Sequence, residues 1–94
     1  MNKVFLEGWI YHIQSRKLPH DVDEVKFNLK TKKIVGKKET DKPEYDYIPC
    51  YAKGKKATNI IRHLSDDSRV YVWGRFYFDN GEKVTIAVDE IEFL

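Results

Sequence analysis

Cysteine and long apolar runs are what this sequence most clearly lacks. Cys50 is the single cysteine among 94 residues, so no internal disulfide can form and a disulfide-stapled scaffold is excluded. Charged residues interrupt every apolar stretch well before the roughly 20 residues that a membrane-spanning helix needs. The N-terminus, Met1 to Val4, leads into a strand-like segment without the apolar core of a signal peptide. We therefore expect a cytoplasmic protein, or one of another reducing space, with no membrane partner.

Metal-ligand and catalytic patterns are also missing. The three histidines lie far apart and have no partner at metal-ligand spacing: His12, His20 and His63. The acidic group Asp21, Asp23 and Glu24 could suggest a divalent metal, but neither a phosphate-binding loop nor a nucleophile accompanies it. We interpret this group as part of a solvated loop. The sequence therefore predicts no metal site, no cofactor and no enzymatic activity.

The net charge of +2 conceals an uneven distribution along the chain. Ten lysines and four acidic residues lie between Lys26 and Lys56, a net charge of +6, whereas the remaining residues carry a net charge of −4. This asymmetry indicates a polyanionic partner, although a lysine run is also typical of a solvated loop. Two tryptophans, five phenylalanines and six tyrosines accompany the charge, and tyrosine rings can lie exposed with the hydroxyl in water.

Apolar and polar residues alternate over most of the chain, which is typical of half-buried β-strands. One segment instead has apolar residues at the i, i+3, i+4 and i+7 spacing of an amphipathic helix: Ala57, Ile60, Ile61 and Leu64. The expected strands lie on both sides of this helix: Val4–Tyr11, Val25–Lys30, Tyr45–Ala52, Val70–Phe78 and a last strand from Val84 to the C-terminus.

The segments between the strands contain turn-forming residues. Gln14–Asp23 is polar and is expected to be a loop, and Lys32–Pro43 a long hairpin arm. Asp79-Asn80-Gly81 predicts a tight hairpin. Gly8 and Gly74 are expected where the strands bend, with a β-bulge at Gly8.

The order of elements is three strands, one helix and two strands. This order matches the OB fold, an all-β, five-stranded Greek-key barrel with one helix between strands 3 and 4. Another small β-barrel or a sandwich is the alternative, and the position of the helix favours the OB fold. We expect a single OB-fold domain over residues 1–94.

Several blocks occur in the order and spacing of a known family. They are Asn2–Gly8, Asp46–Ala52 followed by Gly54-Lys55, Ala57 and Leu64 in the helix, Ser68–Arg75, and Ile91–Leu94. With these blocks the chain resembles the bacterial single-stranded DNA-binding protein (SSB) family over nearly its whole length. The resemblance implies an OB fold and a homo-oligomer, usually a dimer or tetramer, that coats single-stranded DNA during replication, recombination or repair. It also implies that Tyr47 stacks on bases.

The sequence departs from the family in three places. Lys53 stands where the family usually carries a second stacking aromatic, and Val35 falls about where the second strand often carries one. Both changes weaken or relocate the expected stacking. The chain also stops at the last barrel strand, so recruitment of other proteins through an acidic tail is not expected.

The DNA-binding candidates follow from flat rings for bases and cations for phosphates. On Tyr45–Ala52, alternation places Ile48, Cys50 and Ala52 towards the core and the tyrosines on the other face. The expected stacking residues are Tyr45, Tyr47 and Tyr51, Trp73 and Tyr77 on what we take as the neighbouring strand, and Trp9. The expected phosphate contacts are Lys30, Lys32, Lys33, Lys37 and Lys38, reinforced by Lys53, Lys55 and Arg75.

Two functions remain open at this point. The first is sequence-independent binding of single-stranded DNA, in which lysines carry no base readout. The second is an OB-fold interaction module, such as a primosomal accessory or adaptor subunit, that uses its aromatic residues to dock protein.

Overall fold

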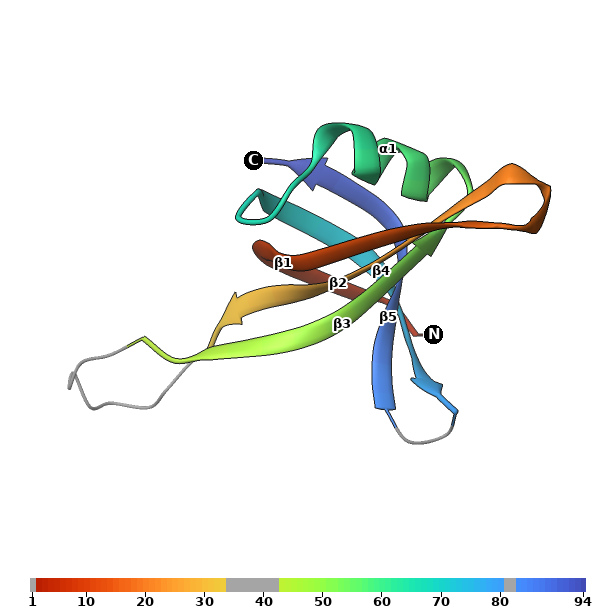
Figure 1. Cartoon of the computed structure of the whole chain (residues 1–94). Coiled ribbons are helices and arrows are strands. Elements are labelled where there is room, and N and C mark those ends of the chain that lie inside the picture. Colours follow the sequence, from red (N-terminus) through yellow and green to blue (C-terminus); the bar gives the residue numbers. More distant parts are fainter. Residues whose placement is uncertain (1, 34–42, 81–82) are drawn as a thin grey trace.

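The computed structural model describes residues 2–33, 43–80 and 83–94, apart from the side chain of Asp79. Figure 1 shows the elements, which run in the predicted order of three strands, a helix and two strands. Their bounds are β1 (Val4–Leu18), β2 (Val22–Lys32), β3 (Tyr45–Lys53), α1 (Lys55–His63), β4 (Arg69–Asp79) and β5 (Lys83–Phe93), with a 3-10 turn at Pro19–Asp21.

The five strands close into one barrel in the order β1-β2-β3-β5-β4. The long, bent strand β1 makes this closure possible, because its first part pairs with β4 and its second part with β2, with Trp9 in both ladders. All pairs are antiparallel except β3 with β5, which run parallel and, within the described part of the chain, pair at Cys50–Ile86 and Tyr51–Ala87. The closed barrel, with its helix between β3 and β4, confirms the OB fold.

The core consists of the alternate residues that point into the barrel, as the sequence predicts. Fully buried members are Ile10, Val25, Leu29, Val70 and Val72. Helix α1 lies across one end of the barrel (Figure 1) and adds Ala57 and Ile60 to the core. The predicted apolar stripe is wrong at Ile61, which is 37% exposed because it lies at the margin of the buried face.

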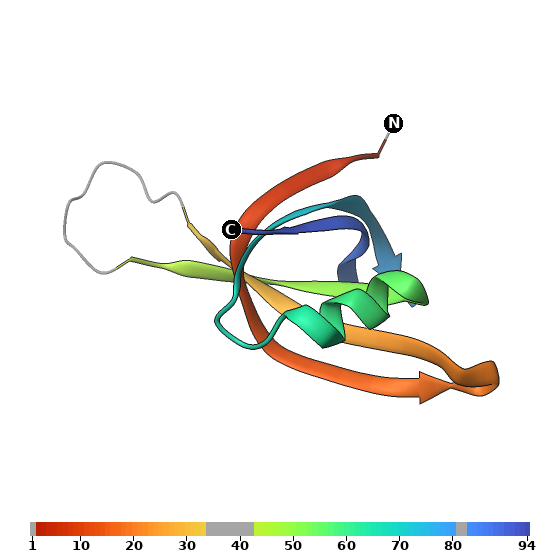
Figure 2. The ribbon, with the colours of Figure 1, turned by 90° about the horizontal axis from the view of Figure 1, so that it is seen from above.

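The expected loop over Gln14–Asp23 is instead a two-stranded hairpin. β1 continues to Leu18 and β2 begins at Val22, so only Pro19–Asp21 turns. Figures 1 and 2 show this hairpin, in orange, extending beyond the barrel. Cross-strand ion pairs hold it, between Arg16 and Glu24 and between Lys17 and Asp23 (2.8 Å). Apart from the pair Leu18 and Val22 at its tip, the hairpin is polar on both faces, so apolar alternation could not reveal it.

The two glycines permit close approach of neighbouring strands. A Cβ at Gly8 would lie 2.3 Å from the carbonyl oxygen of Lys30, and one at Gly74 would lie 2.3 Å from that of Ala87. The ladder of β4 with β5 shifts register at Gly74, in agreement with the expected bend. The bulge expected at Gly8 is wrong, because β1 shifts register further on, between Tyr11 and Gln14. Glycine is required at position 8 because the backbone of Lys30 leaves no room for a side chain.

Candidate functional site

Four aromatic side chains gather on the outer surface of β1, β2 and β3. The ring of Tyr11 lies 5.1 Å from that of Tyr47, and the ring of Trp9 lies 6.2 Å from that of Tyr45 in an edge-on arrangement. These rings lie together because of the strand register: Lys30 of β2 pairs with Trp9 of β1 on one side and with Tyr47 of β3 on the other. We call these four residues together with Lys30 the aromatic face.

The aromatic face is open to solvent and carries the ammonium group of Lys30. Tyr47 is 50% exposed and Tyr11 is 48% exposed, which leaves ring surface available to a ligand. The ammonium group of Lys30 lies 4.2 Å from the centre of the Tyr45 ring, a cation–π distance. The sequence predictions for Trp9, Tyr45 and Tyr47 thus converge on one surface. Tyr11 was not predicted, although its spacing of two from Trp9 was a signal that both share one side of β1.

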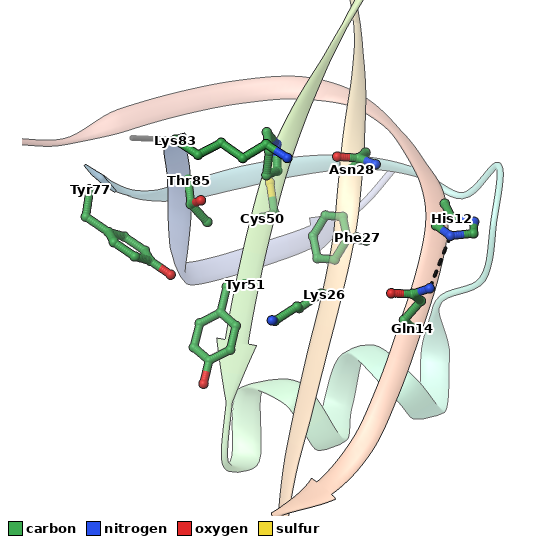
Figure 3. A pocket seen from close by; sticks show the side chains of 11 residues that line it. His12, Gln14, Lys26, Phe27, Asn28, Cys50, Tyr51, Tyr77, Lys83 and Thr85 are labelled. Carbon is green, nitrogen blue, oxygen red and sulfur yellow. Dashed lines mark hydrogen bonds between the residues drawn. The ribbon is translucent and has the colours of Figure 1, made fainter. Parts of the chain in front are cut away.

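A groove of about 540 Å³ continues from the aromatic face across the barrel. Asn28 and Pro49, which stand in register beside Tyr11, line its near side. Figure 3 shows its side chains, with Tyr77 and Lys83 on one side and His12 and Gln14 on the other. The polar and aromatic lining comes from all five strands: His12, Gln14, Lys26, Asn28, Tyr51, Tyr77, Lys83 and Thr85.

The groove unites two predicted rings and adds two cations that were not predicted. Tyr51 of β3 and Tyr77 of β4 both line it, although β3 and β4 are not paired. Lys26 and Lys83 also line it, and neither forms an ion pair with a described residue. Alternation along β2 could have identified Lys26, which shares the outer side with Lys30. Lys83 could not be identified in this way, because β5 lies beside the groove only once the barrel is closed.

The Tyr51 side chain is fixed by a hydrogen bond from its hydroxyl to a carboxylate. Its hydroxyl donates a hydrogen bond to Glu24 (3.0 Å), and the second oxygen of Glu24 accepts one from Arg16. The hydrogen bond from the Arg16 guanidinium keeps the pKa of Glu24 below its ordinary value. Burial, followed by the Glu24 carboxylate, raises the pKa of the Tyr51 hydroxyl. Glu24 is therefore a structural acceptor and not part of the solvated loop that the sequence suggested.

Trp73 belongs to a different wall of the barrel. Its ring lies 4.9 Å from that of Phe5, which in turn lies 5.3 Å from that of Tyr71. The expectation that its strand neighbours the tyrosine strand is wrong, because β4 pairs with β1 and β5. Arg75 of the same strand is hydrogen-bonded to Asp89 of β5 (3.2 and 3.3 Å). Neither residue joins the aromatic face.

The predicted lysines divide into near and distant groups. Lys32 stands opposite Tyr45, and Lys33 lies 3.9 Å from the carboxylate of Glu44 at the same end of β3. Lys53 is six residues beyond Tyr47, which is about 20 Å along a strand, and Lys55 begins α1. Lys37, Lys38 and the position of Val35 lie outside the described residues.

The remaining polar groups have structural roles. Asp23 accepts hydrogen bonds from Lys17 and from the Thr58 hydroxyl (2.6 Å), which ties β2 to α1 and lowers the pKa of the Asp23 carboxyl. Cys50 is 2% exposed on the core side of β3, as predicted, and burial raises the pKa of its thiol to about 12.

Within residues 2–33, 43–80 and 83–94, no group of three or more histidine, cysteine or acidic side chains could hold a metal ion. No helix of that part of the chain has the length and apolar character to cross a membrane.

Comparisons with known proteins agree with the barrel fold. The PriB protein of Ralstonia solanacearum, at 14% sequence identity, superimposes with a TM-score of 0.75 in one solved structure, over 99% of this chain and 97% of that chain. In a second structure the TM-score is 0.76 at 14% identity, over 100% and 99% of the two chains. This likeness shows the fold alone, and no curated protein matches the sequence. The sequence model of the single-strand binding protein family matches residues 1–94. The chain therefore belongs to the single-strand binding protein family.

Proposed function

We propose that the protein binds single-stranded DNA independently of base sequence, through the aromatic face and the adjoining groove. The observation that carries this proposal is the grouping of four rings with Lys30 on one outer surface of the barrel. Every base has a π-face, so stacking on exposed rings contributes about 1–3 kcal/mol per base whatever the sequence. The protein acts as a binding protein and not as an enzyme.

Lysines beside the rings supply the phosphate contacts. Lys26, Lys30 and Lys83 lie on the aromatic face or in the groove, and none of them forms a salt bridge with a described carboxylate, although the charge of Lys26 helps to lower the pKa of Glu24. A lysine ammonium is a point charge on a flexible stem, so it follows a phosphate backbone without reading base edges. This arrangement supports tight binding at low salt and weak preference among sequences.

The strand path follows β3. The rings of Tyr45 and Tyr47 stand at its beginning and that of Tyr51 near its end, and all three share one side of the strand. A single strand that stacks first on the aromatic face then enters the groove between Tyr51 and Tyr77. Such a path suits the 4–16 nucleotides that one OB fold typically covers.

A titration of protein fluorescence with oligo-dT tests the proposal. We expect quenching of tryptophan and tyrosine emission at low salt, followed by recovery as salt is added, because counterions compete for the phosphates. No response at low salt contradicts the proposal. Oligo-dA and oligo-dC of equal length serve as controls, and we expect affinities similar to that of oligo-dT.

We also propose that the protein forms a homo-oligomer. Phe5 is 54% exposed beside Trp73 and Tyr71, so a wall of three rings remains uncovered in the single chain. Burial of such a surface between subunits is a usual way to stabilise a small domain. Light scattering should show a dimer or tetramer, and Phe5→Ser should reduce the assembly. A monomeric wild-type protein at micromolar concentration contradicts this part of the proposal.

The second candidate function is a protein-docking module. One observation favours it: an apolar cleft at the beginning of β1 and β3, lined by Leu6, Ile48, Phe76 and Val84. Phe78 nearby is 60% exposed. Tyr47 lines this cleft as well as belonging to the aromatic face. Single-stranded DNA binding remains the better-supported function, because Lys30 on the aromatic face and Lys26 and Lys83 in the groove can contact phosphates, whereas the cleft is mainly apolar. The oligo-dT titration separates the two functions.

A further inference from the structure

Glu24 lies in an unusual position for a carboxylate. Alternation along β2 directs it to the outer side of the barrel, together with Lys26, Asn28 and Lys30. Its outward neighbours remain partly or largely exposed, yet Glu24 itself is 6% exposed. The side chains of Arg16 and Tyr51 enclose it from the two flanking strands.

A buried carboxylate is costly unless it is paired and hydrogen-bonded. Here one oxygen accepts from the guanidinium of Arg16 and the other from the hydroxyl of Tyr51. The ion pair with Arg16 keeps the carboxylate charged, since it holds the pKa of Glu24 below its ordinary value. The charged acceptor is therefore present at neutral pH, and a hydrogen bond to it is stronger than one to a neutral acceptor.

We propose that Glu24 is a positioning residue that fixes the Tyr51 ring in the groove as a stacking platform beside Tyr77. This inference rests on the proposed binding of single-stranded DNA. Figure 3 shows Tyr51 next to Lys26, with its ring directed away from Tyr77, which lines the same groove. The ring is fixed before a base arrives, so less conformational entropy is lost on binding.

The same hydrogen bond restricts what Tyr51 can recognise. Its hydroxyl proton is donated to Glu24, so the side chain has no hydroxyl donor left for a base and offers the face of its ring and, at most, an acceptor oxygen. Tyr47 differs, because its hydroxyl has no hydrogen-bond partner in the described part of the chain. Tyr51 therefore supplies a fixed ring whose hydroxyl donor is already used, whereas Tyr47 keeps a hydroxyl donor that a base could use.

Three variants test the role of Glu24. Tyr51→Phe keeps the ring and removes the hydroxyl, and we expect affinity for oligo-dT to fall about 3- to 10-fold, the effect of leaving one side chain to be ordered on binding. The salt dependence of binding should not change, because no phosphate contact is lost. Glu24→Leu should weaken binding equally, whereas Glu24→Gln retains an acceptor for the hydroxyl and should rescue most of the affinity.

A double variant distinguishes positioning from general stability. Glu24→Leu should have no further effect on affinity in the Tyr51→Phe background, even where it lowers the melting temperature. Wild-type affinity of Tyr51→Phe overturns the inference, as does an equal loss from Glu24→Leu in both backgrounds. If Tyr47→Ala weakens binding while the Tyr51 and Glu24 variants do not, the inference fails and the proposed function stands. If the wild-type protein does not bind oligo-dT, both fail.

Discussion

The rings of Tyr11 and Tyr47 lie 5.1 Å apart although β1 and β3 are not neighbours in the barrel. The two side chains reach towards each other across β2, where Asn28 stands directly beside Tyr11. A small polar side chain at Asn28 leaves room for this contact. The pair joins the first and third strands on the outside of the barrel, and it lies at the centre of the proposed binding surface.

Replacement of Tyr47 by alanine should weaken the binding of oligo-dT without unfolding the barrel. The expected loss is about 1–3 kcal/mol, the contribution of one stacked base. Fluorescence titration measures the affinity, and circular dichroism checks the fold. Tyr71→Ala, on the other wall, is the matched control and should retain wild-type affinity at equal assembly state. An unchanged affinity of Tyr47→Ala removes this residue from the site.

The two tryptophans should respond differently to DNA. Trp9 belongs to the aromatic face, whereas Trp73 packs against Phe5 on another wall. We therefore expect Trp73→Phe to retain the quenching of tryptophan emission by oligo-dT and Trp9→Phe to lose most of it. The reverse pattern would place the strand on the wall that contains Trp73.

Lys30→Gln should reduce the salt dependence of binding. For single strands, the loss of one phosphate contact lowers the slope of log K against log salt concentration by about 0.7. Lys56→Gln is the control, because Lys56 is paired with Asp89 (4.0 Å) beside α1 and away from the aromatic face. Equal slopes for wild type and Lys30→Gln would show that Lys30 makes no phosphate contact.

Gly8→Ala should destabilise the barrel. The added Cβ meets the backbone oxygen of Lys30, which cannot move without disturbing the ladder of β1 and β2. We expect the free energy of unfolding in urea to fall by about 1–3 kcal/mol, the usual effect of overpacking. Ser15→Ala, at an exposed position of the hairpin, should change it by less than about 0.5 kcal/mol. A stable Gly8→Ala variant would contradict the close approach of the two strands.

The thiol of Cys50 should be unreactive in the folded protein. Burial disfavours the charged thiolate and raises the pKa to about 12, so the neutral thiol persists at pH 8. A disulfide reagent that is added at pH 8 should therefore modify Cys50 only after denaturation with urea. Rapid modification of the native protein would show that this side of β3 opens readily.

Most of the fold was predictable because its core follows simple periods. Alternation along Val25–Lys30 and Tyr45–Ala52 identified the buried residues correctly, and the single helical stripe placed α1. The hairpin over Gln14–Asp23 was missed because it projects from the barrel and buries little apolar surface. Ion pairs such as Arg16–Glu24, and not hydrophobic alternation, hold it, and they become visible only once the two strands are aligned.

The site was predictable within each strand but not between strands. Alternation shows that Tyr45 and Tyr47 share one side of β3, and the same rule applied to β1 would have added Tyr11 to Trp9. It cannot show which strands are neighbours, so Trp73 was assigned to the wrong surface. Alternation also could not predict that Glu24 is buried, because its burial depends on side chains from the two flanking strands.

Among the described residues, the barrel is closed between β3 and β5 by two residue pairs, Cys50–Ile86 and Tyr51–Ala87. Because so few backbone hydrogen bonds join these two strands, we expect local opening of the barrel to begin here. Both strands contribute to the lining of the groove, Tyr51 from β3 and Thr85 from β5. A single strand that binds in the groove would contact residues of both β3 and β5, so we expect its binding to reduce opening of the barrel between these strands.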